Sequence, residues 1–506
     1  MNALDALLPD DEHNRRLAAN VRPSRHVNPT PDGRYNLVVI GAGTAGLVAA
    51  AGAAGLGAKV ALIERSLMGG DCLNVGCVPS KAIVSAARAA AAVRNAGEFG
   101  VRIPDEIEVD FGGVMERMRR LRGDISPHDS VKRFTELGVD VFLGQARFVD
   151  SETVTVDDTA LSFAKAVICT GARAAAPPIP GLDQVRYLTN ETLFSLTELP
   201  RRLAIIGAGP IGCEMAQSFA RFGSEVHLVE ARHGILPRED PDAANIVREQ
   251  MQRDGVRLLC CGRELRLSPA AGGGVRMTVE SHGTGYDITV DQLLVSVGRR
   301  PNVEGLDLEK AGVDHTGQGV VIDDFFRTTN PRIYAAGDIC SPYQFTHAAD
   351  FMARSVLRNA LFKGRARHSG LLVPWCTYTS PELAHIGMNP AEAERRGIAI
   401  ETYTQPMSGI DRAILEGGSE GFVRVHLKKG SDEIAGATIV APDAGDMIGE
   451  ISLAMTHKLG LGSIANAIHP YPTRAEAVRK VGDLHQRARL TPLVRRLFNA
   501  WLRWTR

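Results

Sequence analysis

Two stretches of the chain share the same order of apolar and polar positions. Residues 36–40 form a short β-branched run, a glycine-rich turn follows at once, and an Ala-rich helical segment continues to Gly57. A second apolar run at 60–63 then ends at the acid Glu64. The order of strand, glycine turn, helix, strand and acid predicts a βαβ unit whose turn approaches a dinucleotide.

The same pattern recurs later in the chain. Residues 203–206 lead into a second glycine-rich turn, a helix is predicted through Phe222, and the run 226–229 ends at Glu230. One such turn is a weak indication, but two copies, each between a strand and a helix, indicate two dinucleotide sites. The turn glycines predicted to face phosphates are Gly41, Gly43 and Gly46 in the first copy and Gly207, Gly209 and Gly212 in the second.

The two acids predict how each site binds its ribose. The turn glycines let backbone N–H groups approach a pyrophosphate, and the helix N-terminus faces it with a partial positive charge. Glu64 and Glu230 can accept hydrogen bonds from ribose hydroxyls, and an acid there repels a 2′-phosphate. We therefore expect NADH in preference to NADPH at the second site, although Arg232 nearby weakens that preference.

The remaining patterns predict how the chain is divided. Alternating apolar positions at 139–148 and 153–168 predict an antiparallel meander, and Pro-rich residues 174–181 predict a crossing between domains. Residues 272–274, all glycine, predict a hairpin loop, and a mixed α/β segment begins near residue 370. Polar residues 1–34 are expected either to drape over the body or to be disordered.

Composition narrows the class of protein. A chain of 506 residues predicts about three domains, and equal counts of 58 basic and 58 acidic residues exclude a general attraction to nucleic acid. The longest apolar run, 45–58, is shorter than the ~20 residues needed to cross a membrane, and the N-terminus lacks an apolar signal region. We expect a cytoplasmic protein.

Two of the eight cysteines stand apart from the rest. Cys72 and Cys77 follow the first βαβ unit, in a segment that continues to Lys81. Five residues along a regular helix rise about 7.5 Å, too far for a disulfide, so Gly76 is expected to let the turn distort and bring the sulfurs together. A helix N-terminus and Lys81 are expected to lower the cysteine pKa. The alternatives are an inert pair or a zinc half-site, but no further ligands occur at finger-like spacing and no metal is predicted.

The other six cysteines are expected to be small buried hydrophobic residues: Cys169, Cys213, Cys260, Cys261, Cys340 and Cys376.

The segment 70–81 resembles the redox motif of the class I pyridine nucleotide-disulfide oxidoreductases, a family that includes dihydrolipoamide dehydrogenase, glutathione reductase and mercuric reductase. The resemblance covers about residues 35–485. Residues 335–338 resemble the segment whose Asp contacts the FAD ribityl chain, and 296–302 are similar to the strand that closes the NAD domain. The implied fold is α/β, with two Rossmann-like, doubly wound nucleotide domains and a C-terminal α/β dimerisation domain. The expected parts are an extension (1–34), an FAD domain (35–182 and 303–369), an NAD domain (183–302), a dimerisation domain (370–485) and a basic tail (486–506).

The resemblance also implies the chemistry. NADH would reduce FAD, and the flavin would reduce a Cys72–Cys77 disulfide. Cys77 would be the sulfur beside the flavin, able to form a charge-transfer thiolate, and Cys72 would attack the substrate. Lys81 would lie near the flavin and pair with Glu214, the alternative being a plain pair on a helix surface. The other positions implied at the two cofactors are Gly70, Asp71, Ala146, Thr170, Gly171, Gly298, Gly337, Asp338 and Thr346.

The C-terminal segment departs from the family pattern. Aligned on Pro472, Thr473 and Glu476, the family's catalytic His corresponds to Tyr471, and His469 lies two residues earlier. A tyrosine has a pKa near 10 and is a poor general base. Mercuric reductase resembles this chain in having a tyrosine there, but it also has a C-terminal cysteine pair, and this chain has no cysteine after Cys376. The alternative for Tyr471 and His469 is a packed turn between two prolines.

The last residues, 490–506, predict a basic amphipathic helix. Docking on the chain's own homodimer is the favoured interpretation, and peripheral contact with the inner membrane surface is the alternative. The hypothesis is a homodimeric flavoprotein reductase of a small disulfide or a soft electrophile such as a quinone or metal ion, with no nucleic-acid partner. The alternatives are a dihydrolipoamide dehydrogenase and an electron-delivering subunit of a complex or membrane system. The electron acceptor itself is not predicted.

Overall fold

The computed structural model describes residues 7–104 and 107–506. The chain falls into two compact units, which are described separately. The first comprises Met1–Gly207, Ser218–Val229 and Gly262–Leu371, and the second comprises Ala208–Gln217, Glu230–Cys261 and Leu372–Arg506.

A parallel sheet forms the centre of the first unit. Its order is β3 (Val139–Leu143), β2 (Val60–Glu64), β1 (Tyr35–Ile40) and β6 (Thr159–Ile168), and β18 (Ile333–Ala335) pairs with the far edge of β6. The first predicted βαβ unit is confirmed, because α2 (Thr44–Gly55) connects the parallel pair β1 and β2. The other helices that lie wholly in this unit are α1 (Glu12–Val21), α3 (Gly70–Asn74), α4 (Cys77–Arg94), α5 (Phe111–Ile125), α6 (Val131–Glu136), α7 (Asn190–Leu193) and α10 (Thr346–Phe362).

The predicted meander is wrong for its first strand. β3 runs parallel to β2 in the central sheet, whereas β4 (Ala146–Phe148) and β5 (Thr153–Val156) pair antiparallel with each other and β5 with the start of β6. Alternation of apolar positions cannot separate these cases, since it reports which positions are buried and not the direction of the neighbouring strand.

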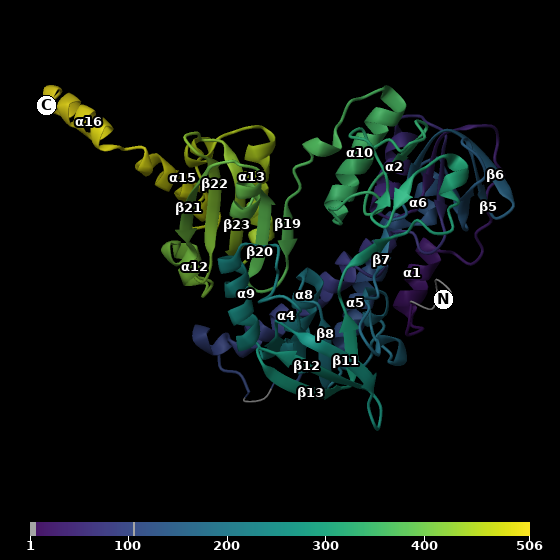
Figure 1. Cartoon of the computed structure of the whole chain (residues 1–506), viewed down its shortest axis with the longest axis horizontal. Helices are drawn as coiled ribbons and strands as arrows, with labels where there is room; N and C mark the ends of the chain where they lie inside the picture. Colours follow the sequence, from purple (N-terminus) through teal and green to yellow (C-terminus); the bar gives the residue numbers. More distant parts are fainter. Residues whose placement is uncertain (1–6, 105–106) are drawn as a thin grey trace. The chain divides into compact units, whose positions relative to one another are not determined.

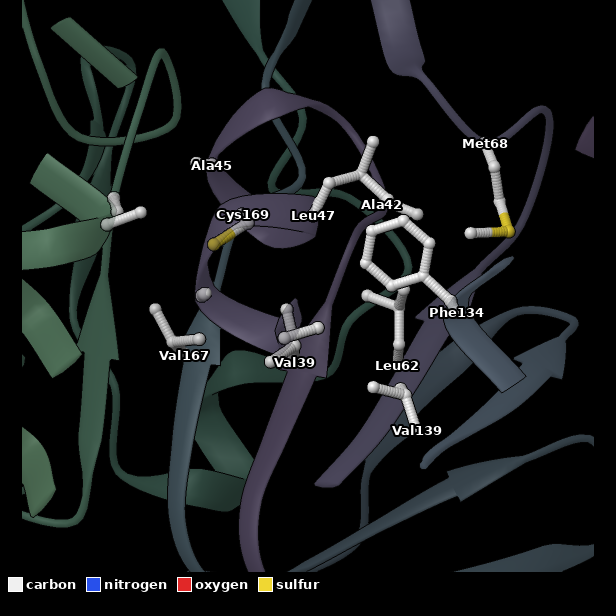
Figure 2. Close-up of a cluster of buried hydrophobic side chains, with 14 of the residues drawn as sticks. Val39, Ala42, Ala45, Leu47, Leu62, Met68, Phe134, Val139, Val167 and Cys169 are labelled. Carbon is white, nitrogen blue, oxygen red and sulfur yellow. The ribbon is translucent and has the colours of Figure 1, made fainter. Parts of the chain in front are cut away.

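Apolar side chains cover both faces of this sheet. Leu37 and Val39 of β1 join the cluster that includes α2, while Val38 and Ile40 join the cluster on the opposite face. Figure 2 shows Val39, Leu62, Val139 and Val167 side by side under the turn that carries Ala42. Burial on both faces is what a doubly wound parallel sheet requires, and it explains the unbroken apolar runs.

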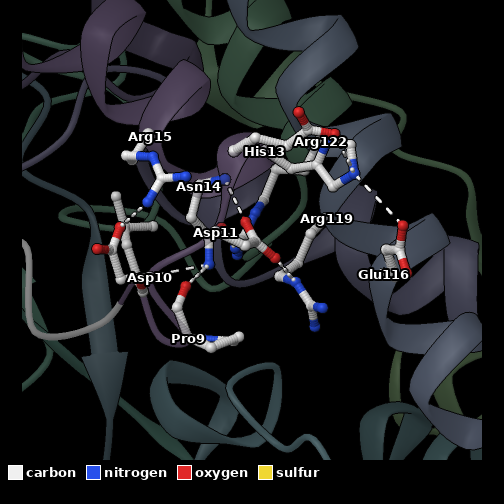
Figure 3. A network of polar contacts seen from close by, with 11 residues as sticks. Pro9, Asp10, Asp11, His13, Asn14, Arg15, Glu116, Arg119 and Arg122 are labelled. Atoms are coloured by element: carbon white, nitrogen blue, oxygen red, sulfur yellow. Dashed lines mark hydrogen bonds and ion pairs between the residues drawn. The ribbon is translucent and has the colours of Figure 1, made fainter.

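The N-terminal segment packs on the first unit from residue 7 onward, and residues 1–6 lie outside the described chain. Helix α1 buries Leu17 and Val21, and Asp11 forms an ion pair with Arg119 of α5 (Figure 3). Arg122 is 1% exposed, donates to Asn14 Oδ1 at 2.7 Å and donates to the Asn74 carbonyl oxygen at 2.6 Å. Burial lowers the pKa of Arg122 to about 10. The prediction that the N-terminal segment packs over the body of the protein is therefore confirmed for its described residues. Through Arg122, the segment is linked to Asn74 at the end of α3.

A second strand–turn–helix–strand motif follows later in the chain. Strands β9 (Glu225–Val229), β8 (Arg202–Ile206) and β14 (Gln292–Val295) pair parallel in that order, and α8 (Pro210–Phe222) connects β8 to β9. The predicted hairpin at 272–274 is confirmed, because it joins β11 (Arg263–Pro269) to β12 (Val275–Ser281). The closing parallel strand ends at Val295, before the predicted 296–302. The remaining strands of the first unit are β7 (Ala172–Ala174), β13 (Thr284–Val290), β15 (Arg299–Pro301), which pairs with β7, β16 (His315–Thr316) and β17 (Gly319–Val320).

The second unit contains an antiparallel sheet. Its order is β19 (Trp375–Thr377), β20 (Glu382–Gly387), β23 (Ile434–Ala441), β22 (Phe422–Lys428) and β21 (Ile400–Pro406). Figure 1 shows α16 (Pro492–Trp504) continuing from α15 away from this sheet, and its apolar side chains, such as Leu497 and Trp501, are more than half exposed. The unit's other elements are α9 (Pro241–Arg253), β10 (Val256–Leu259), α11 (Pro390–Arg395), α12 (Asp411–Leu415), α13 (Ala444–Thr456), α14 (Leu461–Ala465) and α15 (Glu476–Ala488).

Within the described residues, every helix is too short or too polar to span a lipid bilayer.

Candidate functional site

The two cysteines of the redox motif lie on either side of a break between helices. Helix α3 ends at Asn74 and α4 begins at Cys77, so the chain turns at Val75 and Gly76 instead of continuing as one helix. A Cβ on Gly76 would lie 2.7 Å from the Asp71 carbonyl oxygen, so only glycine fits the turn. The predicted distortion is confirmed, and it takes the form of a complete break.

Cys72 is partly buried, and Cys77 is exposed. A hydrogen bond with Cys77 raises the pKa of Cys72, and burial raises it further. The expected lowering is therefore wrong for Cys72 in the reduced pair, because its proton is shared with the neighbouring sulfur. The Cys77 Sγ atom lies 3.3 Å from Thr346 Oγ1, and Cys77 is the first residue of an 18-residue helix. This helix N-terminus favours negative charge on the Cys77 sulfur.

The first glycine turn forms a cradle for a phosphate group. Gly41 has φ of 103°, and a Cβ there would lie 2.4 Å from the Cys169 carbonyl oxygen. Gly70 has φ of 56°, and a Cβ there would lie 2.7 Å from Gly43 Cα, so the redox motif packs directly on the turn. Backbone N–H groups at a helix N-terminus bind phosphate, and a turn without Cβ atoms leaves room for it.

Glu64 lies where the sequence predicts. Its carboxylate accepts hydrogen bonds from the Ala42 N–H at 2.7 Å and the Ser66 N–H at 2.6 Å, and burial raises its pKa. Each carboxylate oxygen has a second lone pair, so the position remains suited to a ribose hydroxyl.

A partly buried charge cluster lies beside the predicted ribityl contact. Arg299 forms ion pairs with Asp71 and, at 3.4 Å, with Asp338, and it donates to the Ala172 carbonyl oxygen at 2.8 Å. Desolvation raises the pKa of Asp338 to about 6. Within residues 7–104 and 107–506, the buried Nε atom of Arg299 lacks a hydrogen-bond partner. Such polar groups fit a polyhydroxyl chain, so the observed residues are compatible with FAD, although sequence reasoning missed Arg299.

The other positions implied for the cofactors are spread over this unit. Thr170 Oγ1 donates to the Asn302 carbonyl oxygen at 3.0 Å, and the Asn302 N–H donates to the Gly171 carbonyl oxygen at 3.0 Å. A Cβ on Gly337 would lie 3.4 Å from the Ala45 Cβ, which places Asp338 near the first turn. Ala146 is buried at the start of β4, and Gly298 has φ of 73° beside Ala175.

The second glycine turn repeats the geometry of the first. Gly207 has φ of 102°, Gly212 lies in α8, and the Glu230 carboxylate accepts from the N–H groups of Ala208 and Arg232, each at 2.9 Å. Within the described chain, a Cβ on Gly209 would meet no atom within 4 Å. The second turn is therefore open at Gly209, whereas the redox motif packs on the first turn at Gly43.

The predicted partners Lys81 and Glu214 belong to different units. Lys81 lies on α4, and Glu214 lies on α8, where it is 3% exposed and accepts a hydrogen bond from the Tyr378 N–H at 3.0 Å. Their pairing stays a prediction.

The C-terminal segment forms a pocket of about 340 Å³ within the second unit. Tyr471 is 70% exposed and donates to Asp411 Oδ2 at 2.8 Å, and this carboxylate raises the pKa of Tyr471. His469 Nε2 lies 2.9 Å from Glu450 Oε1, and its Nδ1 lies 3.1 Å from the Ala467 carbonyl oxygen. Both imidazole nitrogens therefore face protein acceptors. The pocket is lined by Ala465, Asn466, Ala467, Ile468, His469, Tyr471, Glu476 and Arg479.

Glu476 in this pocket carries a buried oxygen. Its Oε1 atom lies 3.2 Å from Arg479, whereas its buried Oε2 atom lacks a hydrogen-bond partner within the described residues. A carboxylate oxygen of this kind is suited to orient a neighbouring hydroxyl or ligand.

Burial of the six other cysteines is confirmed for three of them. Cys169, Cys213 and Cys260 are buried, whereas Cys261, Cys340 and Cys376 are only partly buried. Apolar neighbours in sequence do not ensure burial, because Cys261 and Cys340 lie in loops and Cys376 lies on β19 at the edge of its sheet.

Comparisons with known proteins agree with this arrangement. Residues 35–353 match the family described as "Pyridine nucleotide-disulphide oxidoreductase", and residues 373–481 match its dimerisation domain. The mercuric reductase of Bacillus cereus is 32% identical over 472 residues, which cover 93% of this chain and 74% of the relative. The dihydrolipoyl dehydrogenase of Chlamydia muridarum is 36% identical over 453 residues, which cover 87% and 95%.

Two solved structures share the fold over most of the chain. The Cu(II) complex of the HOCl-induced flavoprotein disulfide reductase RclA from Escherichia coli matches with a TM-score of 0.78 and 29% identity, covering 88% of this chain and 98% of that one. LpdA from Mycobacterium tuberculosis matches with a TM-score of 0.80 and 25% identity, covering 88% and 99%.

Proposed function

The chain belongs to the pyridine nucleotide-disulphide oxidoreductase family, and we propose that it uses NADH to reduce a soft electrophile through FAD and the Cys72–Cys77 pair. A thiophilic metal ion is the favoured electron acceptor, and a small disulfide is the alternative acceptor. Two features together carry this proposal. The turn at Gly76 brings Cys72 and Cys77 together, and Tyr471 stands at the position of the family's general base.

The residues of this chain have distinct tasks in the proposal. Bound FAD would supply the two-electron chemistry that links the nicotinamide to the disulfide. Gly41, Gly43 and Glu64 bind its phosphates and ribose, and Arg299 with Asp338 binds its ribityl chain. Thr346 and the N-terminus of α4 stabilise negative charge on the Cys77 sulfur. Cys72 attacks the acceptor.

Proton balance favours the metal ion. Each turnover takes one electron pair from the dithiol and re-forms the disulfide, releasing two protons, and a metal ion accepts the electrons without a proton. Oxidation of a dithiol substrate instead needs a base that removes protons from its thiols. The Tyr471 hydroxyl donates a hydrogen bond to Asp411, which raises the pKa of Tyr471, and both nitrogens of His469 face protein acceptors.

The preference for NADH rests on Glu230. Its carboxylate accepts hydrogen bonds from the Ala208 N–H of the second turn and from the Arg232 N–H, and a 2′-phosphate there would meet a like charge. Arg232 binds this carboxylate through its backbone N–H, and its guanidinium offsets only part of the repulsion. This arrangement favours the hydroxyl of NADH.

A homodimer would complete the site. Residues 373–481 match the family's dimerisation domain, and the pocket with Tyr471 and Glu476 opens on that domain. We propose that this pocket meets the redox pair of the partner subunit. The tail α16 would then lie at the dimer surface, and contact with a membrane or a larger complex is the alternative.

A dihydrolipoamide dehydrogenase is the second candidate function. The relative from Chlamydia muridarum, at 36% identity over 95% of its length, is the observation that favours it. It requires another group to remove the thiol proton.

Steady-state NADH oxidation separates the candidates. The purified holoenzyme would be assayed with Hg²⁺ in excess small thiol, with oxidised glutathione and with dihydrolipoamide in the reverse direction. We expect turnover with a metal ion that Cys72→Ser lowers at least about 1,000-fold, since the nucleophile is lost. Turnover of dihydrolipoamide alone would refute the metal proposal. If Tyr471→His raises that rate, the base is the missing part.

A further inference from the structure

A second group of sulfur and nitrogen ligands lies outside the redox site. We propose that His233, Cys260 and Cys261 bind one thiophilic metal ion of the Zn²⁺ class. Their ligand atoms lie within 4.8 Å of one another, and all three residues belong to the second unit.

Two loop segments bring these residues together. His233 lies in the loop after Glu230, and the two cysteines follow the last residue of β10, Leu259. The Glu230 N–H donates to the Leu259 carbonyl oxygen at 3.1 Å, and the Cys261 N–H donates to the Arg232 carbonyl oxygen at 2.9 Å. The two segments are therefore held in register by backbone hydrogen bonds on either side of Cys260 and just before His233.

The backbone at Cys261 turns both sulfurs to one side. Adjacent residues of an extended strand point to opposite faces, so neighbouring cysteines would not normally share a ligand. Cys261 instead has φ of 57°, in the left-handed region that favours glycine. A residue with a Cβ in this region is unfavourable, and such residues cluster at functional sites.

The distances suit a tetrahedral ion. With Zn–S of about 2.3 Å and Zn–N of about 2.0 Å, sulfur and nitrogen on neighbouring corners of a tetrahedron lie about 3.5 Å apart. The Cys261 Sγ atom lies 3.6 Å from His233 Nδ1. Cys260 is 7% exposed and would anchor the ion, whereas the exposed His233 leaves a path for its entry.

The donor set fixes the class of ion. Two thiolates and one imidazole select soft or borderline cations over Mg²⁺ or Ca²⁺, and a fourth ligand would complete the tetrahedron. Cys376 is the natural control, because it is a partly buried cysteine of the same unit that contacts Thr377 and Glu382.

Titration with Co²⁺ followed by displacement with Zn²⁺ tests the site. The full-length flavoprotein with Cys72→Ser and Cys77→Ser is used, so that the redox pair binds no metal. We expect one equivalent of Co²⁺ with a sulfur-to-cobalt absorption band, retained in Cys376→Ser. His233→Ala and Cys260→Ser should each weaken binding more than about 100-fold, since loss even of a second-sphere partner costs 10–100-fold.

Cys261→Gly keeps the test independent of folding. Glycine suits the left-handed backbone, so the melting temperature should not fall while metal binding is lost. Equal Co²⁺ affinity in the parent and the three variants would overturn the proposal. So would a Cys260–Cys261 disulfide found by mass spectrometry in protein purified under reductant.

Discussion

The two glycine turns have the same sequence pattern and the same internal hydrogen bonds, yet their surroundings differ. Glu64 and Glu230 each accept one N–H from their own turn and one from the residue two positions later in the chain, and Gly41 and Gly207 both have φ near 100°. A Cβ added at Gly43 would lie 3.8 Å from Gly70, whereas one at Gly209 would meet no atom within 4 Å in the described chain.

This difference separates a retained ligand from an exchanging one. A turn covered by the redox motif releases its ligand only when the motif moves, which suits a cofactor that stays bound through many turnovers. An open turn allows its ligand to enter and leave in each cycle. The geometry therefore supports FAD at the first turn and the nucleotide at the second.

Paired glycine substitutions test this difference and should give the largest effect. Gly70→Ala places a Cβ 2.7 Å from Gly43 Cα at a φ of 56°, so we expect protein that has lost its flavin. Gly209→Ala should keep full flavin content and raise the KM for NADH. Flavin absorbance per protein and NADH kinetics measure both. Full flavin content in Gly70→Ala would contradict the covered turn.

A partly buried acid near the second turn makes this region sensitive to pH. Glu239 accepts from Trp375 Nε1 at 2.7 Å, and burial raises its pKa to about 7 from the usual 4.5. The folded state holds this proton more tightly than the unfolded state, so the free energy of unfolding falls as pH rises from 4.5 to 7. Glu239→Gln should therefore gain about 3 kcal/mol over wild type at pH 8 and nothing at pH 4.

Urea unfolding at both pH values measures this effect. Glu249→Gln, whose side chain is 57% exposed on the neighbouring helix α9, is the matched control and should follow wild type. An equal gain for Glu239→Gln at both pH values would show that ionisation is not the cause.

Neutralising the acid at each turn should have separate consequences. Glu230→Gln should raise the KM for NADH about tenfold and lower the KM for NADPH, because a charged hydrogen bond and a like-charge repulsion are both removed. Glu64→Gln should alter flavin retention and leave the ratio of the two KM values unchanged. A changed ratio in Glu64→Gln would reverse the assignment of the turns.

Deleting residues 490–506 should have the smallest effect. The apolar side chains of α16 are exposed, so the deletion should leave flavin content and both KM values within error. Sedimentation with anionic vesicles and a dimer dissociation measurement compare the intact and shortened chains. Loss of vesicle binding would favour the membrane interpretation, and a weaker dimer would favour docking.

Local patterns predicted the turns and the cysteine pair, because these depend on residues close in sequence. Glycines with positive φ, an acid at a strand end and Gly76 between two cysteines leave few conformations open. The direction of β3, the brace from Arg122 to Asn74 and the Arg299 cluster depend on residues far apart in sequence. Burial patterns do not carry that information. The cluster at His233 was missed because its ligands lie in two separate loops.

An anaerobic titration with NADH, combined with thiol counting, tests the central claim most directly. The oxidised protein should gain two reactive thiols per chain on two-electron reduction and develop a long-wavelength thiolate–flavin band. Neither Cys72→Ser nor Cys77→Ser should gain thiols on reduction. Cys77→Ser should also lack the long-wavelength band. Flavin that bleaches in wild type with an unchanged thiol count would mean that Cys72 and Cys77 do not carry the electrons.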